Sequence, residues 1–376
     1  IHFVYQVVSI LANLILTEYV KRYIMDREMN IQGMQIGPGH PCFVIAEAGV
    51  NHNGQLGKAL ELVTIAKQAG ADAVKFQLYN IEEQISRHTL NAPYQRKGSG
   101  EKTMIEMART YELPWEEHKI IAEHSKNIGI IYMSSCFDYR AVDFFIKELN
   151  GDCIKVGSGE LTNYPLLSYI SKTGLLILLS TGMCTLEDVK GAVEHIKSNG
   201  TSPIVLLHCV SNYPAKVKDI NIRAMITLQK KFNVPVGYSD HTNGNSAAIA
   251  ATALGANVIE KHFTIDRNLP GPDHSMSLNP NELKIFINKI RRTESLIGDG
   301  IKKPTDKEIE MQIFSRRSAV AKCDIKKGEL LSVDNLTLKR PALGIDPREL
   351  ESIIGKKVNQ LIPFDTIITT KMIEMK

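Results

Sequence analysis

Two histidines that follow neighbouring β-rich runs are the strongest candidates for chemistry. His241 lies in GYSDHT and His262 in IEKHFT, each at the end of an apolar run. Two imidazoles on one rim can share a divalent ion, although two histidines without a placed carboxylate are a weak signature. The alternative is that each is a separate hydrogen-bonded residue. With fewer than four evident protein ligands, such a metal site would have open positions, as catalytic sites do.

Hydroxyl and ammonium groups recur at the ends of other runs. Several converging donors are what phosphate and carboxylate oxygens require. A single serine would be explained more simply as a turn or a helix N-cap. Taken together, the set favours an anion site made of Lys155, Ser135, Ser158, Ser180, Ser211 and Ser239.

Carboxylates form a third set, for which the roles of acid, base and sugar-hydroxyl ligand are all open. Its members are Glu47, Glu160, Asp240 and Asp273. The alternative for Glu47 and Glu160 is a buried ion pair with Lys75 or Lys155. His208 lies inside a strand-like run and is interpreted as a hydrogen-bonded core histidine.

Eight short β-rich runs alternate with amphipathic stretches and position these residues. The runs are CFVIAEAG from Cys42, DAVKFQLY from Asp72, GIIYMSS from Gly129, CIKVGSG from Cys153, LLILLST from Leu175, IVLLHCV from Ile204, VPVGYSD from Val234 and NVIEKHF from Asn257. Eight βα units without a glycine-rich dinucleotide turn predict an α/β fold, a closed (β/α)8 TIM barrel. The polar residues gather at the C-terminal ends of the runs, where barrel enzymes build their sites.

The pattern changes at both ends of this region. We expect an N-terminal extension of unknown role at residues 1–35, the barrel at 36–298, a linker at 299–314 and a small C-terminal domain at 315–376. A domain of about 60 residues is only marginally stable by itself, so we expect it to dock on a barrel or on another subunit.

Composition excludes several classes of protein. The 376 residues carry 45 Lys and Arg against 41 Asp and Glu, and a net charge of +4 gives no reason to expect a nucleic acid or a membrane as partner. The six cysteines form no CxxC pair, which fits reduced thiols and a cytoplasmic location. The apolar stretch at residues 3–16 is too short to span a bilayer and lacks the basic region of a signal peptide.

The ordered motifs resemble those of the sialic acid synthase family. They are AEAGVNHNG from Ala46, VKFQ from Val74, KVGSGE from Lys155, LSTGM from Leu179, HCVSNYP from His208, GYSDHT from Gly237, EKHFT from Glu260 and GPDH from Gly271. SRRSAVAKCDIKKGE from Ser315 is similar to the antifreeze-like (SAF, β-clip) domain of those enzymes. The resemblance runs from about Ile36 to the end of the chain.

This resemblance implies a metal-dependent condensation of phosphoenolpyruvate with N-acetylmannosamine, which gives N-acetylneuraminate and phosphate by C–O cleavage. The metal would be Mn or Mg. An N,N'-diacetyllegionaminate synthase, which uses 2,4-diacetamido-2,4,6-trideoxymannose, is the alternative. The rivals from other classes are a noncatalytic carbohydrate-binding or ice-binding protein, suggested by the tail, and a pyruvate aldolase.

The resemblance also implies roles for residues. His241 and His262 would hold the metal, and Glu47 would act near the reacting carbons as a base or a stabiliser of positive charge. The serines and Lys155 listed above would hold phosphoenolpyruvate. The sugar would be bound by Gln77, Glu160, Tyr213, Asp273 and Arg316. Arg316, with Arg317 as the neighbouring alternative, would reach the N-acyl group from the small domain of a partner in a domain-swapped homodimer.

Overall fold

The computed structural model describes residues 29–86, 89 and 103–374, so the apolar stretch at 3–16 lies outside the described residues. The chain divides after Gly298 into two compact units. Each unit is described by itself below.

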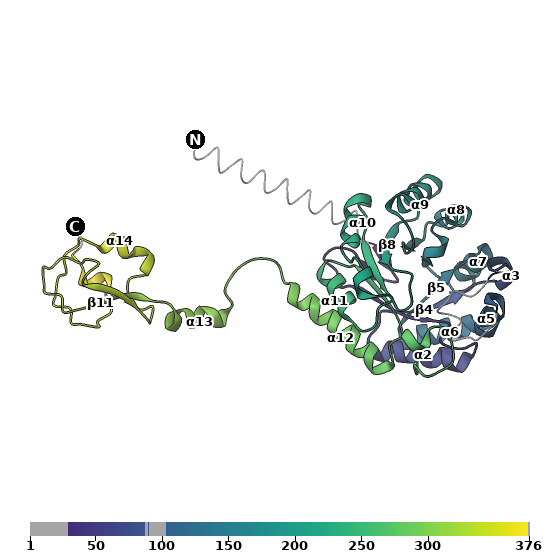
Figure 1. The fold of residues 1–376 in the computed structure, drawn as a ribbon, viewed down its shortest axis with the longest axis horizontal. Coiled ribbons are helices and arrows are strands. Elements are labelled where there is room, and N and C mark those ends of the chain that lie inside the picture. The colour runs from purple at the N-terminus through teal and green to yellow at the C-terminus, as the bar shows by residue number, and fades with distance from the viewer. Residues whose placement is uncertain (1–28, 87–88, 90–102, 375–376) are drawn as a thin grey trace. The chain divides into compact units, whose positions relative to one another are not determined.

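The first unit is built on a closed barrel of eight parallel strands, β3 to β10 (Figure 1). Each of the eight β-rich runs forms one strand, and β10 closes the barrel by pairing with β3. The TIM-barrel prediction is therefore confirmed. The strands are β3 (Phe43–Gly49), β4 (Ala73–Leu78), β5 (Ile131–Cys136), β6 (Cys153–Val156), β7 (Leu176–Ser180), β8 (Ile204–Cys209), β9 (Val236–Asp240) and β10 (Val258–His262).

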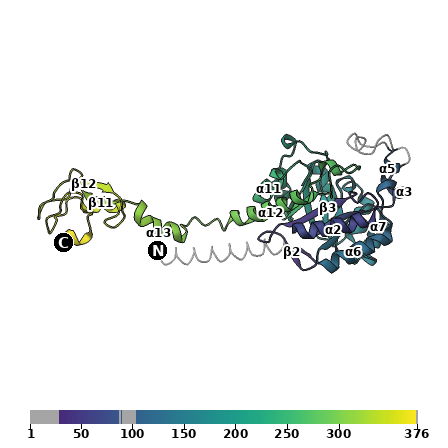
Figure 2. The same cartoon turned by 90° about the horizontal axis from the view of Figure 1, so that it is seen from below.

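Helices surround this barrel. Figure 2 shows α2 and α6, which pack against each other on its outside. The helix α2 ends at Gly70, as its sequence predicts, and this glycine adopts a left-handed conformation with φ of 90°. No described helix has both the length and the apolar character needed to cross a membrane. The helices are α2 (Leu56–Ala69), α3 (Ile81–Gln84), α5 (Met104–Tyr111), α6 (Trp115–Ile128), α7 (Tyr139–Lys147), α8 (Tyr164–Ser171), α9 (Leu186–Asn199), α10 (Ala224–Phe232), α11 (Ser246–Ala253) and α12 (Pro280–Ile297).

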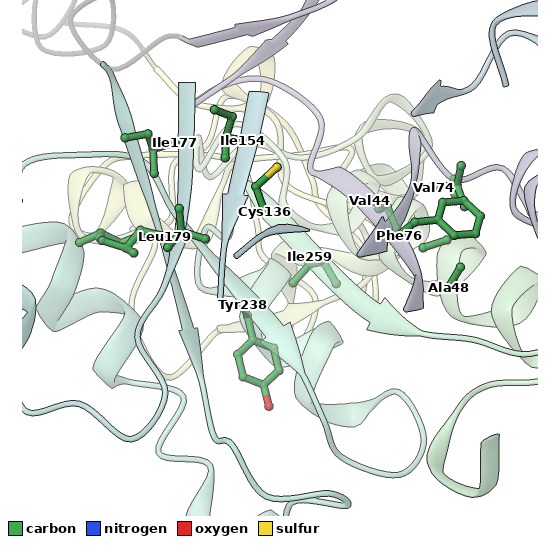
Figure 3. Close-up of a cluster of buried hydrophobic side chains, with 14 of the residues drawn as sticks. Val44, Ala48, Val74, Phe76, Cys136, Ile154, Ile177, Leu179, Tyr238 and Ile259 are labelled. Carbon is green, nitrogen blue, oxygen red and sulfur yellow. The ribbon is translucent and has the colours of Figure 1, made fainter. Parts of the chain in front are cut away.

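The barrel wall has two faces, because successive side chains of a strand point to opposite sides. The outward set, including Val44, Val74 and Ile259, packs under the helices in the larger apolar core (Figure 3). The inward set changes character along each strand. In β3, Ile45 belongs to the interior apolar cluster and Glu47 follows two residues later. The strands therefore deliver apolar groups to the barrel interior and polar groups to its C-terminal end.

A short hairpin closes the other end of the barrel interior. Strands β1 (Met29–Ile31) and β2 (Met34–Ile36) pair antiparallel, and both Ile31 and Ile36 are fully buried in the interior apolar cluster. Residues 29–36 thus pack with the barrel, a role that their sequence does not reveal. Each of these strands has three residues, and an alternating pattern of that length does not distinguish a strand from a loop in the sequence.

Replacing Ile31 with alanine is expected to lower the free energy of unfolding of the barrel by about 2–4 kcal/mol, because it leaves a cavity in a fully buried cluster. Urea unfolding followed by circular dichroism measures this loss. Met34→Ala in the same hairpin is the control, since that side chain is 38% exposed and its loss should cost less than about 0.5 kcal/mol. Equal losses in the two variants would contradict the closing role of the hairpin.

The second unit, Asp299–Lys376, contains the exposed helix α13 (Asp306–Ser315), which is followed by the antiparallel pair β11 (Ser318–Ala321) and β12 (Leu336–Lys339). The short helix α14 (Leu350–Ile353) follows. The second unit has an apolar core of its own, which includes the fully buried residues Ala319, Ile325, Val358 and Ile368. Isolated β-bridges such as Ile325 to Ile362 connect its remaining loops.

Candidate active site

A cavity of about 490 Å³ opens among the loops at the C-terminal end of the barrel strands. Strand register explains why residues distant in sequence meet there. In the register of neighbouring strands, Glu47 lies beside Lys75, Gln77 beside Ser135, and Ser135 beside Lys155. Twelve of the predicted site residues line this cavity: Glu47, Gln77, Ser135, Lys155, Ser158, Ser180, Ser211, Tyr213, Ser239, His241, His262 and Asp273.

Two of the residues predicted to bind the sugar are not among the cavity's lining. Glu160 follows β6 in a short 3-10 helix, and its Oε2 accepts a hydrogen bond of 2.7 Å from Asn163 Nδ2. The ion pair proposed for Glu160 with a lysine is therefore absent from the described structure. Arg316 belongs to the second unit, where its side chain is exposed at the end of α13.

Two residues at neighbouring strand ends have structural contacts that the alternation of side chains explains. Asp240 lies one residue beyond the inward Ser239, and its Oδ2 is 3.0 Å from Lys261 Nζ in a buried ion pair. His208 Nε2 donates to the carbonyl of Ile220 at 2.8 Å, which confirms its interpretation as a hydrogen-bonded histidine. Neither residue is among those that line the cavity.

The two cavity histidines have the properties of metal ligands. Their ring centroids lie 5.7 Å apart. Nδ1 of His241 donates to the Val210 carbonyl at 2.8 Å, which leaves a lone pair on Nε2. Nδ1 of His262 is buried without a hydrogen-bond partner in the described structure. Burial lowers the pKa of His241 to about 4 and that of His262 well below its usual value, so both rings are neutral, the form that binds metal.

Asp273 lies beside this pair, with its Oδ2 4.0 Å from His262 Nδ1, and burial raises the pKa of Asp273 to about 6. A buried network that sequence reasoning missed holds its loop. Asn51 Nδ2 donates to Ser277 Oγ at 3.0 Å, and Ser277 Oγ donates to the Asp273 carbonyl at 2.6 Å.

Across the described ranges, no three His, Cys, Asp or Glu side chains are grouped closely enough for a metal site. A metal held here would therefore have only the two imidazoles as close protein ligands.

Two carboxylates and two lysines alternate at the floor of the cavity. Lys75 Nζ is 2.8 Å from Glu47 Oε2 and 3.7 Å from Glu260 Oε2, and Lys155 Nζ is 3.6 Å from Glu260 Oε1. All four side chains are buried, with at most 5% of the residue exposed. The buried ion pair with Lys75, which was the alternative interpretation of Glu47, is present. Glu260 was missed, although its position two residues before His262 puts it on the same inward face.

The two carboxylates differ in their ionisation. Burial raises the pKa of Glu47 to about 7, because its attraction to Lys75 does not compensate for lost hydration and Glu260 repels its charge. Burial also opposes ionisation of Glu260, but the charges of Lys155 and Lys75 outweigh it, together with the hydrogen bond from Ser239, and lower its pKa to about 2. Glu260 is thus a fixed negative charge, and Glu47 can exchange a proton near neutral pH.

Hydroxyl groups line the side of the cavity formed by β6, β7 and β8. Ser158 Oγ accepts from the Gly182 amide at 2.9 Å and lies 3.2 Å from Cys209 Sγ. A Cβ on Gly182 would be only 2.2 Å from Ser211 Oγ, so glycine is needed for these groups to approach. Ser180 Oγ is buried without a hydrogen-bond partner in the described structure. This side of the cavity therefore has hydroxyl groups that can donate hydrogen bonds to an anion.

Residues 62–302 match the family model described as the NeuB family, and residues 316–374 match the SAF domain. The chain belongs to the NeuB family. The assignment to the sialic acid synthase family with a C-terminal antifreeze-like domain is thereby confirmed, and this NeuB family member is an enzyme, a nonulosonic acid synthase.

The alignments with two named relatives cover about nine-tenths of this chain. The N,N'-diacetyllegionaminic acid synthase of Legionella pneumophila is 43% identical over 343 residues, which cover 90% of this chain and 96% of that protein. The human N-acetylneuraminate-9-phosphate synthase is 35% identical over 344 residues, 91% of this chain and 95% of that protein.

A solved structure shares the fold of this NeuB family member. It is the N-acetylneuraminic acid (sialic acid) synthetase of Leptospira borgpetersenii in complex with citrate, which is 34% identical to this chain. The match has a TM-score of 0.68 and covers 76% of this chain and 94% of that one.

Proposed function

We propose that this enzyme condenses phosphoenolpyruvate with an N-acylated mannosamine-type sugar and releases phosphate and a nine-carbon 2-keto acid. The observation that carries the proposal is the union, in one cavity, of a hydroxyl-rich anion site, two buried lysines and two neutral histidines. An anion and an aldehyde that needs activation would both find partners there.

The anion site suits phosphoenolpyruvate. Lys155 and the five serines Ser135, Ser158, Ser180, Ser211 and Ser239 would bind its phosphate and carboxylate oxygens. Lys75 extends this set, since its Nζ donates to Ser135 Oγ at 2.7 Å. Buried lysines interact more strongly with an anion than exposed ones do, because water screens them less.

The histidines suit the sugar end of the reaction. His241 and His262 would hold a divalent ion, Mn or Mg, which when bound supplies Lewis-acid polarisation of the sugar aldehyde. The unpartnered Nδ1 of His262 and the oriented ring of His241 fit this role. Gln77, Tyr213 and Asp273 would position the sugar, and the Tyr213 ring already packs on His241 with centroids 4.2 Å apart.

Glu47 would act on the reacting carbons, as a base or as a stabiliser of positive charge. Carbon C3 of phosphoenolpyruvate forms the new bond to the aldehyde carbon, the C=O π bond of the aldehyde breaks and its oxygen takes up a proton, and C2 develops positive charge. Water then adds at C2 and loses a proton, and phosphate leaves with cleavage of its bond to C2. A carboxylate at Glu47 can stabilise that charge and accept the proton, because its pKa lies near neutral pH.

Two sugars are candidates. The first candidate is N-acetylmannosamine, with N-acetylneuraminate as the product, because the motifs are those common to the family and this is the reaction of its central member. The second candidate is 2,4-diacetamido-2,4,6-trideoxymannose, with N,N'-diacetyllegionaminate as the product. It is supported by the 43% identity to the Legionella pneumophila synthase against 35% to the human one.

A phosphate-release assay with phosphoenolpyruvate, each sugar and Mn tests the proposal. We expect phosphate release that needs both a sugar and the metal. Release of none with either sugar would favour the noncatalytic carbohydrate-binding alternative. Condensation with pyruvate in place of phosphoenolpyruvate would favour an aldolase.

The second unit would complete the sugar site of a partner in a domain-swapped homodimer, in the cytoplasm. Arg316 is the proposed contact to the N-acyl group. Both arginines are exposed, but Arg317 Nη1 donates to the Leu338 carbonyl at 3.3 Å.

Replacing Arg316 with alanine should raise the KM for the sugar about tenfold or more and leave the KM for phosphoenolpyruvate within about twofold. Steady-state kinetics in each substrate measures both. Arg317→Ala is the matched control and should change neither KM. A similar rise in the two KM values of Arg316→Ala would argue against a sugar contact.

A further inference from the structure

A long loop follows β10 and carries Asp273 to the cavity. The loop covers residues 263–277, and hydrogen bonds join its two ends. The Leu278 amide donates to the His262 carbonyl at 3.0 Å, and the Thr264 amide donates to the Leu278 carbonyl at 2.9 Å. The chain therefore leaves and re-enters the barrel wall at one place, and the position of Asp273 depends on what holds the loop between its ends.

A chain of side-chain hydrogen bonds connects this loop to the segment that follows β3. His274 is fully buried, with its Nε2 2.9 Å from Asn53 Oδ1 and its Nδ1 2.6 Å from Thr264 Oγ1. Asn53 Nδ2 donates to the Pro270 carbonyl at 2.9 Å. We call these four residues the loop brace. Because β3 and β10 are neighbours in the barrel, the loop brace joins the C-terminal ends of two adjacent strands.

The partners fix the direction of each hydrogen bond. Asn53 Nδ2 faces the Pro270 carbonyl, so Asn53 Oδ1 faces His274, and Nε2 of that ring carries the proton. Burial lowers the pKa of His274 to about 4, so the ring is neutral and Nδ1 accepts from the Thr264 hydroxyl. That hydroxyl is also 3.2 Å from the Asp266 carbonyl, but its single hydrogen serves the shorter contact. Each donor in the brace thus faces one acceptor.

The loop lies tightly on the brace and leaves little room around Asp273. A Cβ on Gly271 would be 2.6 Å from His274 Cδ2 and 3.1 Å from Asn53 Oδ1, so glycine lets the loop approach the ring. On the other side, Asp273 Oδ2 is 4.0 Å from His262 Nδ1. A shift of the loop would therefore move this carboxylate relative to the histidine pair.

We infer that Asn53 and His274 are positioning residues, which hold the carboxylate of Asp273 in place to bind the sugar. The inference rests on the proposed condensation, in which Asp273 positions the sugar. Neither Asn53 nor His274 is among the described residues that line the cavity, so both act through the loop. A carboxylate that is already held in place loses less conformational freedom when a sugar hydroxyl binds to it.

Asn53→Asp tests the loop brace with little change of shape. Asn53 has a left-handed φ of 52°, which aspartate also tolerates, but a carboxylate oxygen cannot donate to the Pro270 carbonyl. We expect the KM for the sugar to rise about tenfold and the KM for phosphoenolpyruvate to stay within about twofold. Steady-state phosphate release with Mn measures both, and circular dichroism reports folding. An unchanged KM for the sugar, or an equal rise of the two KM values, would overturn the inference.

Asn268→Asp is the matched control, because it makes the same exchange at an exposed position of the same loop. Both KM values should stay within about twofold of wild type. A tenfold rise of the sugar KM in this control would assign the effect to the added charge and contradict the role of the loop brace.

Two substitutions of His274 test the hydrogen bonds separately from packing. His274→Leu removes both of its hydrogen bonds and should raise the KM for the sugar about tenfold. His274→Gln keeps a donor for Asn53 Oδ1 and should bring that KM back to within about threefold of wild type. Equal rises in the two variants would contradict positioning through this hydrogen bond.

A double-mutant cycle with Asp273→Asn shows whether Asn53 acts through Asp273. Adding Asn53→Asp to Asp273→Asn should raise the KM for the sugar less than about twofold further, because the carboxylate that the loop brace positions is already gone. A further tenfold rise would show that Asn53 acts elsewhere and would overturn the inference alone. A wild-type enzyme that releases no phosphate with any of the sugars would overturn the condensation and the inference together.

Discussion

Replacing His262 with alanine is expected to abolish metal-dependent phosphate release while the barrel stays folded. The ring of His262 is neutral, its Nδ1 has no hydrogen-bond partner in the described structure, and it is one of the two proposed metal ligands. Its loss should therefore reduce Mn affinity and lower kcat/KM about 10³-fold or more. Phosphate release gives the rate, electron paramagnetic resonance gives free Mn, and circular dichroism reports folding.

His208→Gln is the control for this variant. His208 also belongs to a barrel strand, but its ring bonds to the Ile220 carbonyl and does not line the cavity. It should retain Mn binding. Wild-type activity and Mn affinity in His262→Ala would rule out the assignment of this histidine as a metal ligand.

The dependence of kcat/KM on pH is expected to follow the ionisation of Glu47. Burial raises the pKa of this carboxyl to about 7, so below that pH it is protonated and cannot accept a proton. The value of kcat/KM should therefore rise with pH through about 7 and fall about tenfold per unit on the acid side. Initial rates across that range, at saturating metal, measure the profile.

Glu47→Gln separates this carboxylate from the other titrating groups. We expect kcat/KM to fall about 10²- to 10⁴-fold and the rise near pH 7 to disappear, because glutamine does not ionise. Glu61→Gln on the exposed surface of α2 is the matched control and should keep the wild-type profile. A persistent rise near pH 7 in Glu47→Gln would assign that titration to another group.

Most of the barrel could be read from local patterns. Each β-rich run became a strand because alternating inward and outward positions are both buried, which gives the continuous apolar character of parallel strands. The same alternation, applied at strand ends, would have found Glu260 from His262 and excluded Asp240, which follows the inward Ser239.

Other features had no local signal. The hairpin at residues 29–36 is recognisable only once the open end of the barrel interior exists for Ile31 and Ile36 to fill. The Asn51 to Ser277 hydrogen bond joins residues 226 positions apart. Glu160 resembled the other strand-end carboxylates, but the 3-10 turn after β6 brings its carboxylate to Asn163.

The sequence by itself determined the strand count, the family and which residue types stand at the strand ends, because these depend on periodicity and on motifs of a few residues. Only the tertiary structure decided how those groups act on one another. The same carboxyl type has a pKa of about 7 at Glu47 and about 2 at Glu260. Burial and the sharing of two lysines produce that difference, and both arise only when the barrel closes and β10 pairs with β3.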